Sequence, residues 1–174
     1  MYCVIDTERI KGNQIYSFSY QLYDENLRLY ESKTYQDMSI DVSNRKSPKR
    51  KVRELDSISI KVESLKKLYE TVRIFIEDNL TIVFNLIDVH TFKQNCKDDN
   101  IKYKNIKCID LQEVLYYLSK DEKHKSNLKG CCEVNGKRHN PHIPASDCEE
   151  TFKLFQDLIA KFGLDDLLSI VKER

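Results

Sequence analysis

The sequence is poor in the residues that build turns and linkers, with 4 glycines and 3 prolines among 174 residues. It also lacks any apolar run approaching the ~18 residues that a membrane-spanning helix needs. Its first residues, MYCVIDTE, carry no basic leader followed by an apolar block. We therefore expect no membrane contact and an intracellular, cytoplasmic location.

An excess of charge of one sign is missing as well. Lys and Arg together number 29 and Asp and Glu number 28, for a formal net charge of +1. This balance excludes a uniformly basic nucleic-acid coat protein and a disordered acidic tail. With 40% hydrophobic residues, a chain of this length fits one globular domain, and we expect residues 1–174 to form it.

Six cysteines would permit three disulfides, but a domain of this size can bury a core without them. Two of the six are adjacent, which does not suit separate bridges. We expect reduced thiols that are buried as small hydrophobic groups. The cysteines are Cys3, Cys96, Cys108, Cys131, Cys132 and Cys148.

The first part of the chain predicts three strands in succession, over residues 2–5, 15–23 and 27–35. Residues 15–23 alternate between two sets of side chains with a period of two, which is typical of a half-buried strand. A turn signal, Asp24-Glu25-Asn26, separates the second strand from the third. The three strands should form an antiparallel meander.

After residue 60 the hydrophobic period becomes helical, and short apolar strands alternate with amphipathic helices. Hairpin strands followed by helix-alternating strands predict an α/β fold, with a mixed sheet of a meander plus parallel strands, flanked by helices. The predicted helices cover residues 61–79, 89–96, 111–118, 126–132, 147–162 and 164–172, and the predicted strands cover residues 81–84 and 107–109.

Two acidic residues follow the first apolar strand. Asp6 and Glu8 are separated by one residue, so strand geometry directs both side chains to the same face. Converging carboxylates repel each other unless a proton or a cation lies between them, and hard oxygen ligands suit Mg²⁺ or Mn²⁺. The pattern alone is weak, because Asp147-Cys148-Glu149 repeats it and a solvated strand end would look the same.

Acidic residues from two distant segments strengthen the metal-site interpretation. Asp88 comes just after the predicted strand 81–84, and parallel pairing would bring it beside Asp6. Asp147 begins the strongest amphipathic helix, five residues after His142. Asp6, Glu8, Asp88 and Asp147 would hold two cations, Mg²⁺ or Mn²⁺, roughly 4 Å apart. His142 would act as general base, a role that its near-neutral pKa suits.

At this point the sequence resembles the DEDDh 3′-to-5′ exonucleases of the ribonuclease H-like fold. The resemblance spans nearly the whole chain: residues 2–8 are similar to the first motif, residues 84–88 to the second, and His142 to Asp147 match the spacing of the third. The chain departs from the family at Arg9-Ile10, where Thr-Gly often follows the first motif. The second motif, Phe84-Asn85-Leu86-Ile87-Asp88, is one residue short and lacks the usual His and Phe.

The resemblance implies an enzyme that removes nucleoside 5′-monophosphates from the 3′ end of single-stranded DNA or RNA. It implies two-metal hydrolysis with Asp6, Glu8, Asp88 and Asp147 as ligands and with His142 as base. The resemblance leaves open whether a protein partner also binds. The alternative is a catalytically inactive ribonuclease H-like module that binds nucleic acid or a protein.

Two other signals have competing interpretations. Six cations within nine residues could attract phosphates, although such a run is more often a solvated surface; they are Arg45, Lys46, Lys49, Arg50, Lys51 and Arg53. A zinc-dependent interaction domain is also conceivable, because three cysteines and two histidines fall within residues 131–148, but their spacing is not that of a zinc site. A nucleophilic pair of Cys148 and His142 lacks an identifiable third residue to orient it.

Overall fold

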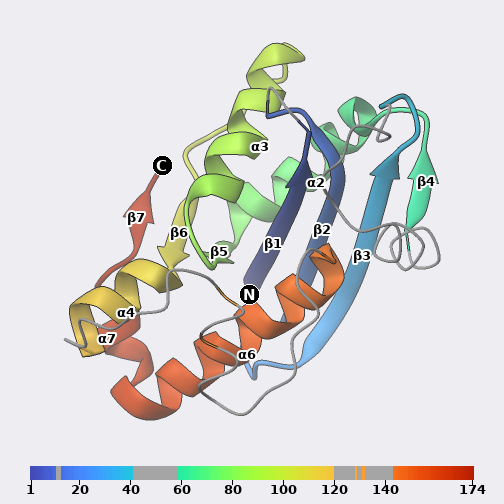
Figure 1. Ribbon diagram of the computed structural model, residues 1–174. Coiled ribbons are helices and arrows are strands. Elements are labelled where there is room, and N and C mark those ends of the chain that lie inside the picture. The colour runs from blue at the N-terminus through green and yellow to red at the C-terminus, as the bar shows by residue number, and fades with distance from the viewer. Residues whose placement is uncertain (11–12, 41–58, 120–127, 129–130, 132–142) are drawn as a thin grey trace.

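The computed structural model describes residues 1–10, 13–40, 59–119, 128, 131 and 143–174. These residues form a seven-stranded mixed sheet with the strand order β4-β3-β2-β1-β5-β6-β7 and helices on both faces (Figure 1). The strands are β1 (Tyr2–Arg9), β2 (Ile15–Tyr23), β3 (Leu29–Asp37), β4 (Ile60–Val62), β5 (Leu80–Val83), β6 (Lys107–Asp110) and β7 (Lys172–Glu173). The helices are α2 (Leu65–Asp78), α3 (Ile87–Asp98), α4 (Leu111–Ser119), α6 (Pro144–Phe162) and α7 (Leu164–Leu168).

The sheet combines the two kinds of pairing that the sequence predicts. β1, β2 and β3 pair antiparallel as a meander. β5 pairs parallel to β1, and β6 pairs parallel to β5, with α3 as the connection between them. The predicted α/β class and mixed sheet are therefore confirmed, and β1 lies at the centre of the sheet.

Strand alternation in β1 divides the core into two layers. Cys3 and Ile5 face the cluster built with α2 and α3, where Phe18 of β2 and Phe92 of α3 lie with ring centroids 5.6 Å apart. Tyr2 and Val4 face the cluster built with α4, α6 and α7. Figure 1 shows α6 crossing this second face of the sheet. Any side chain on the Val4 side of β1 therefore points toward α6.

The prediction that β2 is half-buried was wrong, because every residue of β2 is buried. Helices cover both of its faces, so its polar side is enclosed as well. Gln21 donates a hydrogen bond from Nε2 to the Ala145 carbonyl at the start of α6, at 3.3 Å. The Ser19 and Thr34 hydroxyls are hydrogen-bonded at 2.5 Å. The polar residues of this strand are thus satisfied inside the protein.

Several predicted boundaries differ from the structure. The predicted helix 61–79 begins later, because residues 60–62 form the edge strand β4, parallel to β3. The Ser64 side chain then accepts a hydrogen bond from the Lys66 N–H and caps α2. The predicted helix 164–172 ends at Leu168, and the short strand β7 follows it.

Other boundaries shift less. β1 continues to Arg9, beyond the predicted residues 2–5, and α6 begins at Pro144 instead of residue 147. Proline is tolerated at the first position of a helix, where no intrahelical hydrogen bond needs its missing N–H. Most of the predicted helix 126–132 lies outside the described residues.

The five described cysteines, all but Cys132, carry free thiols. Four of them are buried, as the sequence predicts, and Cys131 is partly exposed. Among the described residues, no helix has the length and apolar character to cross a membrane.

Candidate active site

β1 presents two carboxylates on the face that α6 covers. Asp6 pairs with Ser19 of β2, and Glu8 pairs with Ser17. Paired residues of neighbouring strands lie on the same face of a sheet, so the short serine side chains flank the two acids. Tyr16 donates a long hydrogen bond of 3.4 Å from its hydroxyl to Glu8 Oε2.

α6 brings the third carboxylate from a segment that is distant in the sequence. Asp147 is buried in the first turn of this helix, and its N–H donates to the Ile143 carbonyl at 2.9 Å. The next residue, Cys148, holds the first turns of α6 against the sheet, because its thiol donates to the Val4 and Ser19 carbonyls at 3.9 and 3.7 Å. Packing of Phe155 against the Tyr2 ring, with centroids 5.6 Å apart, supports the same contact.

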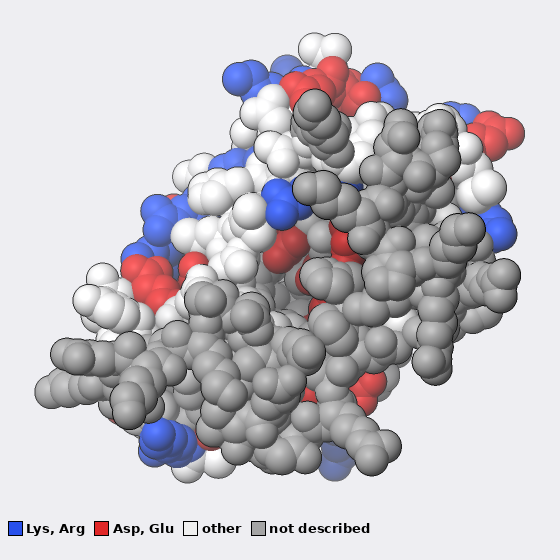
Figure 2. Space-filling model, viewed as in Figure 1, with Lys and Arg blue, Asp and Glu red and all other residues white. Residues whose placement is uncertain are grey.

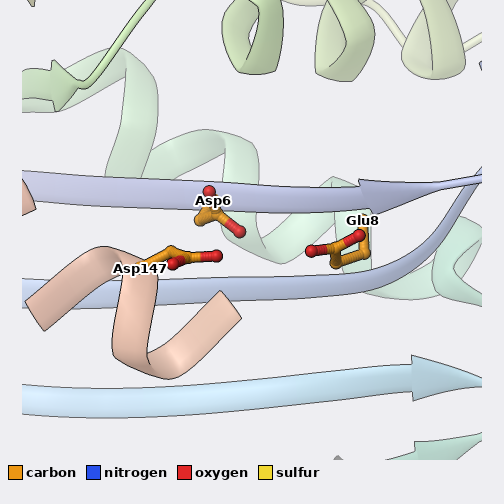
Figure 3. Close-up of side chains that lie close together, drawn as sticks. All are labelled: Asp6, Glu8 and Asp147. Atoms are coloured by element: carbon orange, nitrogen blue, oxygen red, sulfur yellow. The ribbon is translucent and has the colours of Figure 1, made fainter. Parts of the chain in front are cut away.

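Carboxylate oxygens of Asp6, Glu8 and Asp147 all lie within 4.8 Å of one another. Figure 3 shows Asp6 and Glu8 along one strand, with Asp147 reaching toward them from α6. Asp6 and Glu8 are partly buried and Asp147 is buried. The side-chain convergence expected from the sequence therefore occurs for these three acids.

Asp88 approaches β1 from another direction. It lies in the first turn of α3 and is 8% exposed. Its Oδ1 atom accepts hydrogen bonds from both the backbone N–H and the hydroxyl of Thr7, at 3.1 and 2.6 Å. Asp88 is thus fixed beside the residue that separates Asp6 from Glu8, but it is not part of the three-carboxylate cluster.

Burial and neighbouring negative charges raise the pKa of Asp6 and of Asp88. The pKa of Asp6 is raised well above its usual value, first by burial and then by the negative charges of Asp88, Asp147 and Glu8. Burial raises the pKa of Asp88 to about 6, although the hydrogen bonds from Thr7 act in the opposite direction. The positive charge of Arg9 acts in the opposite direction on both residues and offsets part of the rise in pKa. An arrangement of this kind needs protons or cations to hold the carboxylates together.

The donor set fits hard divalent cations. Three convergent carboxylates offer oxygen ligands of the type that Mg²⁺ and Mn²⁺ prefer. The unfavourable charge of ionised Asp6 is what a bound cation would offset. The chemistry of the residues present therefore suits Asp6, Glu8 and Asp147 as direct ligands, with Asp88 close enough to influence them.

Sequence reasoning missed the contribution of Thr7, which holds Asp88 in place. Its position between two acids of a strand was the available signal, since it must point to the opposite face from Asp6 and Glu8. The sequence also gave no reason to expect that Tyr16 contacts Glu8.

Several predicted residues lie outside the described part of the chain. They include His142 and all six cations of the basic segment, Arg45, Lys46, Lys49, Arg50, Lys51 and Arg53. Of the residues considered for zinc, Cys132 and His139 also lie outside it.

Cys148 is poorly suited to zinc binding or to nucleophilic attack. Burial raises the pKa of the Cys148 thiol well above its usual value, and the nearby Asp6 and Asp147 charges add to this effect. Metal binding and nucleophilic attack both need the thiolate. The structure therefore disfavours the zinc and nucleophile alternatives at this residue.

A scan against protein-family models gives no match, and a search of curated proteins gives no match either. Solved structures do match. The nuclease domain of 3′hExo, a DEDDh family member bound to rAMP, has a TM-score of 0.68 at 15% identity, over 99% of this chain and 95% of that one. This chain has the fold of a DEDDh exonuclease.

Two further solved structures share this fold. A 3′-exonuclease that recognises the 3′ end of the histone mRNA stem-loop has a TM-score of 0.69 at 14% identity, over 92% of this chain and 82% of that one. Exonuclease X, in complex with duplex DNA carrying a 5′ overhang, has a TM-score of 0.58 at 13% identity, over 98% of this chain and 99% of that one. The ribonuclease H-like fold expected from the sequence is confirmed.

Proposed function

We propose that residues 1–174 form one domain that acts as a metal-dependent 3′-to-5′ exonuclease on the 3′ end of single-stranded DNA or RNA. The observation that carries the proposal is the convergence of Asp6, Glu8 and Asp147 within 4.8 Å, in a fold shared with DEDDh exonucleases. The matching structures are described with an RNA stem-loop, with rAMP and with duplex DNA. Both kinds of nucleic acid are therefore candidate substrates.

The proposed ligands are carboxylates with distinct tasks. Two Mg²⁺ or Mn²⁺ ions would be bound directly by Asp6, Glu8 and Asp147. Asp88, which is held by Thr7, would help to position an ion from the α3 side. Such ions, when bound, offset negative charge on the phosphate and on the attacking and leaving oxygens. The residues themselves supply a partly buried set of convergent oxygen ligands.

His142 is the proposed general base. Its sequence position, five residues before Asp147, is the support for this role. It would accept a proton from the attacking water as the phosphodiester bond breaks, releasing a nucleoside 5′-monophosphate. The basic residues 45–53 are proposed to attract the strand, and an intracellular, cytoplasmic location remains a prediction from the sequence.

Shortening of a 5′-labelled single strand in the presence of Mn²⁺ tests the proposal. Wild-type protein should produce a ladder of products that are shorter by single nucleotides, and Asp6→Asn should abolish it. Asp165→Asn is a matched control, because Asp165 is an exposed aspartate in α7, beyond the opposite end of α6 from Asp147. Its activity should equal that of the wild type.

The alternatives give other results in the same assay. Binding of the strand without shortening would favour the inactive module. Stoichiometric zinc in the purified protein, with unfolding on addition of a chelator, would favour the zinc-dependent domain. Shortening that is unaffected by Asp6→Asn would reject the acid cluster as the active site.

A further inference from the structure

Arg9 is the positively charged residue closest in sequence to the acid cluster, directly after Glu8 at the end of β1. The pairing of β1 with β2 shifts its register between Glu8 and Arg9. The guanidinium donates from Nη1 to the Thr91 hydroxyl of α3, at 3.1 Å. Asp88 lies three residues earlier on the same helix, so Arg9 is anchored at the α3 side of the site.

Through Thr91 the guanidinium is held one helical turn from Asp88, but it is not paired with a carboxylate of the described residues. Its positive charge lowers the pKa of both Asp6 and Asp88. In the described part of the chain, however, the bond to Thr91 is its one hydrogen bond, and no carboxylate there lies within 4.0 Å of it. An arginine has five N–H donors, so most of its donors remain available.

The side chain can also be reached from solvent. Arg9 is partly exposed, whereas Thr91, which anchors it, is buried. Figure 2 shows acidic atoms near the centre of the view with basic atoms beside them. A fixed, partly exposed guanidinium on the α3 side of an acidic cluster is well placed for an anionic ligand, and its planar fork matches a phosphate group.

We propose that Arg9 contacts a phosphate of the nucleic-acid strand that engages the acid cluster. This inference rests on the proposed function and assigns a substrate-binding residue to that site. The Thr91 hydroxyl holds the guanidinium through one Nη1 hydrogen bond, which leaves other donors available for a phosphate. Arg9 acts in strand binding, while the carboxylates act in cation binding.

The competing explanation is that Arg9 serves as an internal counter-charge for the acids. The two explanations predict different results when the charge is removed. If Arg9 is only a counter-charge, its removal leaves the affinity for nucleic acid and its salt dependence unchanged and makes divalent-ion binding tighter. Loss of a phosphate contact weakens strand binding and lowers its dependence on salt.

The experiment compares the full-length wild type with Arg9→Gln, Arg9→Lys and Arg28→Gln. Arg28 serves as the matched control. It is an exposed arginine in the turn between β2 and β3, at the end of the β-sheet opposite to Arg9. Binding of a fluorescein-labelled single strand is followed by anisotropy in Ca²⁺ at several KCl concentrations. Binding of Mn²⁺ alone is measured by calorimetry without nucleic acid.

Arg9→Gln should weaken strand binding by roughly fivefold to tenfold. The slope of log K against log salt should become shallower by about 0.7, the value for one phosphate contact on a single strand. Arg9→Lys should keep the wild-type slope, because it keeps the charge. Affinity for Mn²⁺ should be unchanged or higher in Arg9→Gln, and Arg28→Gln should match the wild type throughout.

Unchanged strand affinity and salt slope in Arg9→Gln would overturn the inference, as would an equal effect of Arg28→Gln. The binding assay separates this failure from that of the exonuclease proposal. If the wild type binds the nucleic-acid strand but does not shorten it, the exonuclease proposal is rejected. In that case a shallower slope of log K against log salt in Arg9→Gln would still support the phosphate contact. A wild type that binds no strand would overturn both.

Discussion

Thr7 donates both its backbone N–H and its hydroxyl to a single oxygen of Asp88, at 3.1 and 2.6 Å. This pair of hydrogen bonds joins the first turn of α3 to the central strand at the point where β1 carries its two acids. It fixes a buried carboxylate near Asp6 despite the mutual repulsion of the two groups. The structure thus holds together charges that would separate in a flexible chain.

Two substitutions of Asp88 should distinguish the effect of its charge on stability from the effect of its hydrogen bonds. Asp88→Asn keeps an oxygen that accepts both bonds from Thr7 but removes the charge. In metal-free protein at neutral pH, it should raise the free energy of unfolding by roughly 1–3 kcal/mol. Asp88→Ala leaves the two Thr7 donors without their acceptor and should be less stable than Asp88→Asn by about 1–3 kcal/mol. Denaturant unfolding in EDTA measures both, and equal stability of the two variants would contradict the account.

The stability of the metal-free protein should fall as the pH rises. The pKa of Asp88 is about 6 in the folded protein, above its ordinary value of 3.8, and the pKa of Asp6 is raised as well. A group with a raised pKa favours folding below its unfolded pKa, and this contribution is lost as the pH passes through the folded pKa. The free energy of unfolding in EDTA should therefore decrease between about pH 4 and pH 7. The free energy of unfolding of Asp88→Asn should decrease less over this pH range than that of the wild type.

Divalent ions should reverse this loss of stability. Mn²⁺ or Mg²⁺ at about 100 times its dissociation constant should add roughly 2.7 kcal/mol to the free energy of unfolding at neutral pH. Asp6→Asn should be more stable than the wild type without metal, because it removes a repelling charge, but should gain little from Mn²⁺. Thermal unfolding with and without Mn²⁺ measures both effects. Equal stabilisation of Asp6→Asn and the wild type by Mn²⁺ would place the metal elsewhere.

Cys148 should contribute to stability and not to chemistry. Its thiol is fully buried and donates to two backbone carbonyls of the sheet. Cys148→Ala should lower the free energy of unfolding by about 1–2 kcal/mol. Exonuclease activity at a temperature where the variant is folded should stay within roughly threefold of the wild type. A complete loss of activity in folded protein would return the cysteine to the list of catalytic candidates.

The sequence predicted the centre of the fold better than its edges. The bounds of β2 were predicted correctly, because residues 16–22 alternate strictly between apolar and polar side chains and give a strong signal. The three residues of β4 and the two of β7 are too short to show a period. Such strands form because a neighbouring strand offers unpaired backbone groups, and that information is not local in sequence.

The site was predicted to the extent that it depends on strand alternation and on parallel pairing. Asp6 and Glu8 share a face because alternation requires it, and the parallel pairing of β1 with β5 leads the chain to Asp88. Alternation places Thr7 on the opposite face of β1 from the two acids, but its double hydrogen bond to Asp88 also depends on how α3 packs on the sheet, which the sequence does not show. The anchoring of Arg9 on Thr91 has the same origin.

Crystals soaked in Mn²⁺ give the most direct test that acids from distant segments jointly bind metal ions. Anomalous scattering locates manganese without reference to the surrounding protein. The account predicts two peaks about 3.5–4 Å apart, with Asp6, Glu8 and Asp147 as ligands and with Asp88 beside them. Absence of manganese at these residues, under conditions where the protein is active, would contradict it.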